Sequence, residues 1–276
     1  MAPVTNLQSP IELPVNRRIP HPHLAFPFVQ SQTENEFVHY GSPYDQISRI
    51  FVGLNPSWNE IDAIEFREGI PVGFVSQCKL EEKEIPVQRL RQSSHPSLLK
   101  IREVFFLKGS AYFIYDQWGL TLAEILHLSP VFRLSEVEVA VICKAVLLGL
   151  RYIHKELDIH YGGLSPSKIL VTNMGEVKIT GIGKRLFQKP SSLEKARDVQ
   201  AVCRLARCLL DDEETTSVHG TIGLLAEDFA GAPATVTADE LLQHPFLQVS
   251  AVSWCLRPIH ILYKVALERK QELDSR

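Results

Sequence analysis

The sequence predicts an α+β fold, with a small antiparallel β-sheet forming an N-terminal lobe and helices forming most of a C-terminal lobe. Short apolar runs separated by turn residues fill residues 45–115, which is typical of antiparallel strands. From residue 135 onward, apolar residues recur with the spacing of a helix face. With 276 residues, 45% of them hydrophobic, the chain is long enough to bury a core across two such lobes.

The domain boundaries follow from a change in composition. Six of the 17 prolines lie within the first 30 residues, where no apolar period is sustained. We therefore expect residues 1–35 to be an extended proline-rich arm and residues 251–276 to be a C-terminal helix. Between them, residues 36–250 are predicted to form the two-lobed domain, with an N-lobe at about 45–116 and a C-lobe at about 117–250.

The N-lobe is predicted to hold short strands joined by tight turns. Strands are expected at residues 47–52, 61–66, 72–75, 101–106 and 111–115. Residues 55–60 are rich in turn formers and are expected to join the first two strands. Residues 81–94 predict a short helix that contains an unfavourable proline at Pro86.

The C-lobe begins with the clearest helix signal in the chain, at residues 135–155. Ser135 is a good N-cap, and Glu138 three residues later completes a capping box. Strands are expected at residues 169–171 and 177–179, followed by helices at residues 198–210 and 258–273.

Charge and cysteine content exclude several classes of protein. The net charge of −3 gives no overall basic surface for nucleic acid or for an anionic membrane. No apolar run is long enough to span a membrane, and residues 1–6 lack the features of a signal peptide. Five dispersed cysteines favour neither a disulfide framework nor a zinc site, and His21 and His23 have no further metal ligands nearby. We expect a cytoplasmic or nuclear protein.

Several motifs in a fixed order resemble those of eukaryotic protein kinases. These are residues 149–154 (GLRYIH), 161–170 (YGGLSPSKIL), 175–183 (GEVKITGIG), Asp198-Val199 and 238–247 (ADELLQHPFL). They are similar to the end of the long C-lobe helix, the catalytic loop, the D-F-G segment, the following D-V/I-W helix and the end of the kinase domain. The resemblance covers roughly residues 45–248 and implies a kinase-like fold with a shortened C-lobe.

The catalytic groups that the resemblance implies are missing. The catalytic aspartate falls on Gly163, the catalytic-loop lysine on Ser165, the metal-binding asparagine on Lys168 and the metal-binding aspartate of D-F-G on Gly181. Phosphoryl transfer depends mainly on positioning and on charge, and these positions offer no oxygen ligand for magnesium. We therefore predict neither a catalytic residue nor a metal site.

The nucleotide-binding positions are also altered. Residues 53–58 (GLNPSW) stand where kinases have a glycine-rich phosphate loop, and the phosphate-binding lysine falls on Val75. Lys79 is a weak substitute, because the helix glutamate that should partner it falls on Pro86. Four residues are hinge candidates: Tyr115, Asp116, Gln117 and Trp118. No cofactor is predicted, and metal-independent nucleotide binding is left open.

Substrate handling is reduced as well, because only 17 positions separate Gly181 from Asp198 and no A-P-E motif closes the segment. Ser191 and Ser192 are candidates for phosphorylation, although a solvated loop is the favoured interpretation. Packing positions are kept: the resemblance places Tyr161 and Ile182 in an apolar stack between the lobes. Asp198 remains where kinases anchor the catalytic-loop backbone.

The favoured hypothesis is a pseudokinase, a kinase-like domain that is not an enzyme and acts as a scaffold or allosteric regulator. Its partner is expected to be another protein, an active kinase or its substrate, rather than nucleic acid or membrane. Candidate contact surfaces are the proline-rich arm, Trp58 and the C-terminal helix. The alternative is residual or atypical ATP-dependent kinase activity with relocated catalytic groups. A hydrolase that uses Ser165 and His160, or a decayed duplicate without a molecular role, is left open.

Overall fold

The computed structural model describes residues 37–80, 87–116, 118–129, 131–187, 191–210, 221–249 and 253–274. The chain divides into two units, Met1–Asn35 and Glu36–Arg276, and all of the described residues belong to the second. The predictions for the proline-rich arm with His21 and His23, and those for Pro86 and Gln117, lie outside the described residues.

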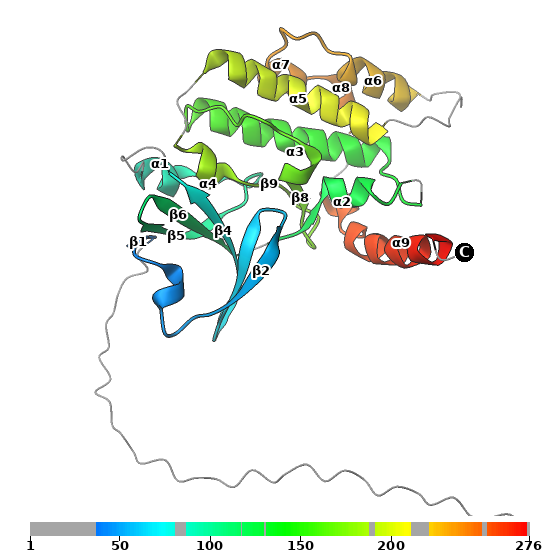
Figure 1. The fold of residues 1–276 in the computed structure, drawn as a ribbon. Helices are drawn as coiled ribbons and strands as arrows, with labels where there is room; N and C mark the ends of the chain where they lie inside the picture. The colour runs from blue at the N-terminus through cyan, green and yellow to red at the C-terminus, as the bar shows by residue number, and fades with distance from the viewer. Residues whose placement is uncertain are drawn as a thin grey trace, which may run out of the picture. The chain divides into compact units, whose positions relative to one another are not determined.

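Six strands of the described chain form the N-lobe sheet, in the order β1-β5-β6-β4-β3-β2 (Figure 1). They are β1 (Val38–Tyr40), β2 (Ile50–Trp58), β3 (Ile61–Arg67), β4 (Ile70–Lys79), β5 (Ile101–Leu107) and β6 (Ser110–Tyr115). All neighbours are antiparallel except β1, which runs parallel to β5. The short helix α1 (Val87–Gln92) lies within the range predicted as helical.

The turn predicted at residues 55–60 is wrong for most of its length. Strand β2 continues to Trp58, and its register with β3 shifts between Gly53 and Trp58. The chain reverses at Asn59 and Glu60 instead, and both have positive φ angles of 49° and 68°. Such angles suit a two-residue hairpin turn, because their twist matches that of the flanking strands.

One face of the N-lobe sheet carries a network of buried ion pairs. Arg49 contacts Glu65 at 3.0 Å and also pairs with Glu103, and Arg102 pairs with Glu65 as well. Arg102 Nη1 lies 3.0 Å from Asp116 Oδ1, which ties the residue after β6 to the sheet. Mutual pairing offsets the cost of removing these charges from water.

The C-lobe is built around α3 (Glu136–Lys155), which Ser135 and Glu138 cap as predicted. A second sheet has three strands, β7 (Leu120–Thr121), β8 (Ile169–Val171) and β9 (Val177–Ile179), and there are 3₁₀ turns η2 (Pro166–Lys168) and η3 (Ser253–Leu256). The other helices are α2 (Leu122–Leu126), α4 (Ile182–Arg185), α5 (Ser192–Leu210), α6 (Thr221–Ala230), α7 (Ala238–Leu242), α8 (Pro245–Gln248) and α9 (Ile259–Asp274). Helices α3 and α5 pack side by side (Figure 1).

A single apolar core joins the N-lobe sheet to the C-lobe helices. It includes Val104 and Phe113 of the sheet, Leu147 of α3 and Val202 of α5, all of them buried. The structure therefore confirms the predicted α+β class, with a mostly antiparallel N-lobe sheet and a helical C-lobe in a kinase-like fold. Burial of this continuous apolar surface is the main source of the fold's stability.

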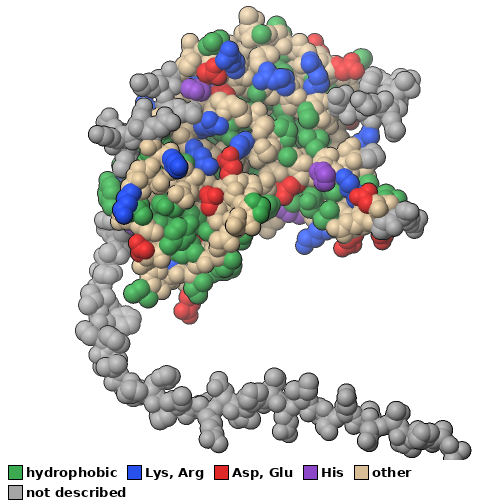
Figure 2. Space-filling model, viewed as in Figure 1, with side chains coloured by type: hydrophobic (Ala, Val, Ile, Leu, Met, Phe, Trp, Pro, Cys, Tyr) green, Lys and Arg blue, Asp and Glu red, His purple; other side chains and the backbone are tan. Residues whose placement is uncertain are grey.

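The surface of the described residues is apolar over part of the N-lobe. Figure 2 shows hydrophobic side chains gathered over the sheet, where Ile50, Val52, Phe66 and Val72 are exposed. Among the described residues, no helix combines the length and the apolar character needed to cross a membrane.

The contact between Gly119 and β8 generates a prediction about stability. A Cβ atom on Gly119 would lie 2.8 Å from the carbonyl carbon of Val171 and 3.1 Å from Cα of Thr172, both backbone atoms with little freedom to move. We expect Gly119→Ala to lower the free energy of unfolding by about 1–3 kcal/mol, as overpacking does elsewhere. Chemical denaturation measures this change.

Gly53→Ala is the matched control, since a Cβ there meets nothing within 4 Å. We expect it to leave the free energy of unfolding unchanged or slightly raised, because alanine restricts the unfolded chain. Equal stabilities for the two variants would show that the backbone near Gly119 is looser than described.

Candidate functional site

The loop at residues 161–168 is anchored by a buried carboxylate. Asp198, the seventh residue of α5, accepts hydrogen bonds from the backbone N–H of Tyr161 at 2.6 Å and of Gly162 at 2.8 Å. Its Oδ2 also lies 3.0 Å from His154 Nε2 of α3. Hydrogen bonds to an ionised acceptor are among the stronger ones in proteins, so Asp198 fixes this loop as predicted.

Tyr161 extends the anchor to the segment that precedes Gly181. Its ring is buried and its hydroxyl donates to the carbonyl of Thr180 at 3.0 Å. Burial raises the pKa of Tyr161, which keeps the hydroxyl protonated as a donor. Tyr161 and Ile182 both lie in the core that joins the lobes, which confirms their predicted packing.

Three glycines shape the backbone of this site. Gly162, Gly163 and Gly181 have φ angles of +67°, +75° and +69°, a left-handed region that glycine adopts without strain. Gly163 and Gly181 are the positions that the resemblance assigns to the catalytic and metal-binding aspartates. Neither offers a side-chain oxygen, and the Ser165 hydroxyl lies 3.0 Å from that of Ser167.

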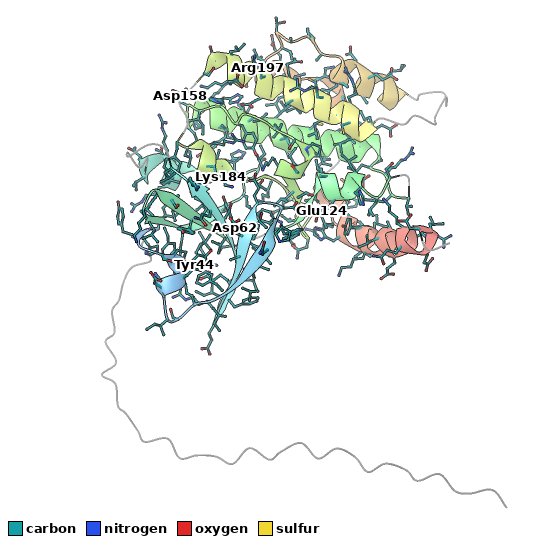
Figure 3. The ribbon with its side chains drawn as sticks, viewed as in Figure 1. Tyr44, Asp62, Glu124, Asp158, Lys184 and Arg197 are labelled. Atoms are coloured by element: carbon teal, nitrogen blue, oxygen red, sulfur yellow. The ribbon has the colours of Figure 1, made fainter. Side chains whose placement is uncertain are left out.

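A glutamate of the N-lobe reaches two lysines of the C-lobe at this point. Glu60, in the turn between β2 and β3, pairs with Lys168, and its Oε2 lies 3.5 Å from Nζ of Lys184. Lys184 lies on α4 and is labelled in Figure 3. A Cβ placed on Gly181 would lie 4.0 Å from the same oxygen. The carboxylate of Glu60 therefore lies beside the position of the missing D-F-G aspartate.

The two lysines stabilise the charged form of Glu60. Partial burial alone would raise the pKa of Glu60, but the hydrogen bond to Lys168 and the charges of Lys184 and Lys168 together lower it below its ordinary value. Glu60 thus remains a carboxylate at neutral pH.

The assignment of the phosphate-binding lysine to Val75 does not fit the direction of its side chain. Val75 packs with Ala63 and Ile114 in a small separate cluster, whereas Phe74 and Cys78 pack against the main core. Because side chains alternate along a strand, Val75 and the exposed Lys79 share the face that points away from the helices. This placement gives no support to a nucleotide role for Lys79.

The hinge candidates make contacts within the chain. Tyr115 is fully buried, and its hydroxyl has no partner among the described residues. Asp116 pairs with Arg102, as described above. The Trp118 ring stacks on Phe74 with centroids 5.8 Å apart and lies 6.1 Å from the ring of Trp58. These rings fill part of the space between the hinge and the β2–β3 hairpin.

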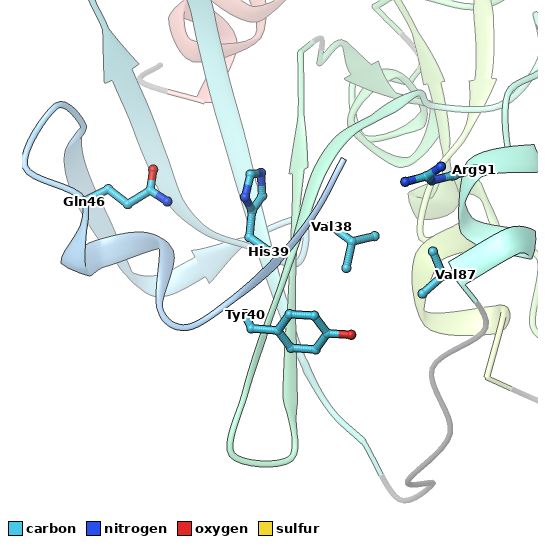
Figure 4. A pocket seen from close by; sticks show the side chains of 6 residues that line it. All are labelled: Val38, His39, Tyr40, Gln46, Val87 and Arg91. Atoms are coloured by element: carbon cyan, nitrogen blue, oxygen red, sulfur yellow. The ribbon is translucent and has the colours of Figure 1, made fainter. Parts of the chain in front are cut away.

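The rest of the described chain holds a cavity but no cluster of metal ligands. No group of three His, Cys, Asp or Glu side chains there could hold a metal ion. A cavity of about 430 Å³ lies between β1 and α1, lined by Val38, His39, Tyr40, Gln46, Val87 and Arg91 (Figure 4). None of these residues is a predicted site residue.

Two helices follow Gly181 in the part of this segment that the structure describes. Helix α4 begins at Ile182, and Ser192 is the first residue of α5, so its interpretation as part of a solvated loop is wrong. The Ser191 hydroxyl accepts a long 3.4 Å hydrogen bond from the Glu194 N–H, as an N-cap residue does.

Sequence reasoning missed Glu60, Lys184 and Arg185. The sequence predicts Glu60 only as part of a turn, because its long-range pairing with Lys168 has no local signal. Lys184 and Arg185 directly follow the D-F-G-like segment, where adjacent positive charges were a sign available in the sequence.

Comparison with known proteins agrees with this geometry. The chain is similar to protein kinases. It is 34% identical over 120 residues to mitogen-activated protein kinase kinase 1 of Arabidopsis thaliana, covering 43% of this chain and 33% of that protein. It is 24% identical over 208 residues to cyclin-dependent kinase 12 of Caenorhabditis elegans, covering 70% and 27%. Serine/threonine-protein kinase TAO3 of Pongo abelii is 25% identical over 174 residues, covering 62% and 19%.

The matched segments thus span about a third or less of the length of these kinases. No family model matches the chain. The similarity supports a place in the kinase superfamily and agrees with the kinase-like fold; the activities named for these relatives are their own.

The anchoring role of Asp198 can be tested with Asp198→Asn. Asparagine keeps the shape of aspartate but has no charge, and its side-chain NH₂ replaces one oxygen that accepts hydrogen bonds in this site. Because two donors would then face each other, we expect the free energy of unfolding to fall by about 3 kcal/mol. Asp239→Asn is the control, since Asp239 is exposed and pairs with the exposed Lys155. Equal losses in the two variants would contradict the anchoring role.

The Glu60 contact predicts a pH-dependent stability. Because the pKa of Glu60 is lowered in the folded state, its contribution is present above the unfolded-state pKa and is lost as the pH falls through the folded-state pKa. We expect wild type to be more stable than Glu60→Gln near pH 7 and the difference to vanish at low pH or in high salt. Thermal unfolding from pH 3 to 7 measures it, and a difference that grows on acidification would contradict the pairing.

Proposed function

We propose that this chain is a catalytically inactive kinase-like domain that serves as a scaffold or allosteric regulator of another protein. The observation that carries the proposal is the contact of Glu60 with Lys168 and Lys184 at the degenerate metal positions. Lys168 and Gly181 stand where the resemblance implies the two metal ligands, and neither supplies the oxygen that a hard cation requires.

The residues present do not fit a magnesium–nucleotide complex. Lys168 repels a cation, while Gly163 and Gly181 supply no ligand. Glu60 is the nearest carboxylate to Gly181 among those described here, and its two oxygens already face lysine ammonium groups. Without a bound metal, the charge on transferring phosphates is not neutralised, and phosphoryl transfer loses its main source of catalysis.

The hinge supports the same proposal. An adenine ring needs an open apolar slot, and here Trp118 lies against Phe74 and near Trp58. Asp116 is committed to Arg102 in the sheet network. Base binding would therefore require these aromatic side chains to move apart.

Exposed apolar side chains suggest surfaces for a protein partner. Trp254, Ile261 and Val265, on η3 and α9, are 60%, 70% and 59% exposed. Trp58 at the hairpin tip is 41% exposed, so part of its ring packs on the chain and part of it faces solvent. Tryptophan is enriched among residues that dominate binding energy at interfaces, so these positions are the first to mutate once a partner, an active kinase or its substrate, is captured.

The decisive experiment is thermal unfolding with millimolar ATP, in magnesium and then in EDTA, alongside a phosphotransfer assay. We expect no magnesium-dependent shift in the midpoint and no transfer, with an active protein kinase as positive control. A ligand at 100 times its dissociation constant would stabilise the fold by about 2.7 kcal/mol, which is several degrees.

A magnesium-dependent shift, or transfer of phosphate, would overturn the proposal in favour of atypical kinase activity. Lys79→Ala then tests the relocated lysine, since loss of the shift in that variant would assign it a nucleotide role. A shift that survives in EDTA would leave the domain inactive and make nucleotide a structural ligand.

A further inference from the structure

Arg185 differs from the other cations around the catalytic-like loop because it has no acidic partner among the described residues. Its guanidinium lies over the ring of Tyr161, 5.3 Å from the ring centroid. Lys168 and Lys184, by contrast, both face Glu60. A cation–π contact orients a guanidinium without using its hydrogen-bond donors.

The donors of Arg185 face a stretch of backbone without side chains. Cβ atoms placed on Gly162 and Gly163 would lie 3.9 Å from Nη1 and Nη2, respectively. Gly163 is exposed to solvent. Nη2 therefore borders an exposed position, the one at which the resemblance has the catalytic aspartate, whereas the half-buried Gly162 beside Nη1 also faces the ring of His160.

The charges around this position sum to a positive value. Lys168, Lys184 and Arg185 contribute +3, and Glu60 and Asp198 contribute −2, which leaves +1. The oxygens of Asp198 are already occupied by the Tyr161 and Gly162 N–H groups and by His154. The unmatched charge is thus that of Arg185, with Lys184 only loosely held at 3.5 Å from Glu60.

We infer that Arg185, beside Gly162 and Gly163, forms a metal-free oxyanion site with Lys184, its neighbour on α4, and that this site takes a phosphate monoester. The planar fork of arginine matches two phosphate oxygens, and a phosphate dianion can engage the lysine as well. The inference rests on the proposed function, because a working phosphotransfer loop would present an acid here rather than a guanidinium.

Glu60 is the built-in competitor of this site. Its carboxylate pairs with both Lys184 and Lys168. Removing that negative charge frees Lys184 and raises the local positive potential. The site therefore predicts opposite effects for two substitutions, a gain of anion affinity at Glu60 and a loss at Arg185.

The test is calorimetric titration of the full chain, in EDTA, with inorganic phosphate and with O-phosphoserine. We expect Arg185→Gln to weaken phosphate binding at least about tenfold, since a charge-assisted pair is lost. Arg185→Lys keeps the positive charge but lacks the planar guanidinium, so its phosphate affinity should lie between those of wild type and Arg185→Gln. Glu60→Gln should tighten binding several-fold, and Arg197→Gln, on an exposed arginine paired with Glu194, should leave it unchanged.

Unchanged affinity in Arg185→Gln would overturn the inference, as would absence of phosphate binding in both wild type and Glu60→Gln. Thermal unfolding without anion shows whether each variant folds, and Arg185→Lys keeps the test valid should Arg185→Gln not fold. Titration with ATP in EDTA distinguishes the source of the phosphate. If ATP binds more tightly than O-phosphoserine and this binding is lost in Arg185→Gln, the result supports the site and assigns it to a nucleotide. Failure of phosphate binding leaves the proposed inactivity intact, whereas phosphotransfer with magnesium overturns that proposal independently.

Discussion

The buried carboxylate of Asp198 is the constraint on which the candidate site depends. It fixes the backbone at Tyr161 and Gly162, and the Tyr161 hydroxyl then fixes the carbonyl of Thr180. The Thr180 N–H in turn donates to the Lys168 carbonyl at 2.9 Å, which closes the path between the loop and the segment before Gly181. Each of these hydrogen bonds pairs a backbone group that would otherwise have no partner. This hydrogen-bonded frame therefore stabilises the fold whether or not the domain is a catalyst.

Around this frame the charged positions differ from those that the kinase resemblance implies, while the apolar packing positions are kept. Positions that the kinase resemblance assigns to acids or amides are glycines or a lysine, and Glu60 of the opposite lobe supplies the negative charge. A substitution of Gly for Asp at a left-handed backbone position costs no strain, and Tyr161 and Ile182 fill volume in the core. The fold accommodates glycine at residues 163 and 181 because neither position contributes a side chain to the apolar core.

Features with a local cause were predictable from the sequence, and those with a long-range cause were not. The capping box at Ser135 and the β8–β9 hairpin follow from neighbouring residues, and the structure has them where the sequence predicts. The face of the sheet on which the Val75 side chain lies could not be predicted. In a strand that is apolar on both faces, the sequence shows no alternation of polar and apolar residues that would distinguish them. The pairing of Glu60 with Lys168 depends on how the two lobes close, which no spacing along the chain encodes.

The Glu60 contact is better suited to exchange than to holding the lobes together. The Glu60 side chain is 46% exposed although that of Lys168 is only 18% exposed, so water and salt compete for the carboxylate and weaken the pair. The apolar core that runs from Phe113 to Val202 has no such competitor. An anion that offers more charge can therefore displace Glu60 without unfolding the domain. Two states of the β2–β3 hairpin, paired and released, would then differ at the surface around Trp58, and a ligand that binds one of them better shifts the population toward it.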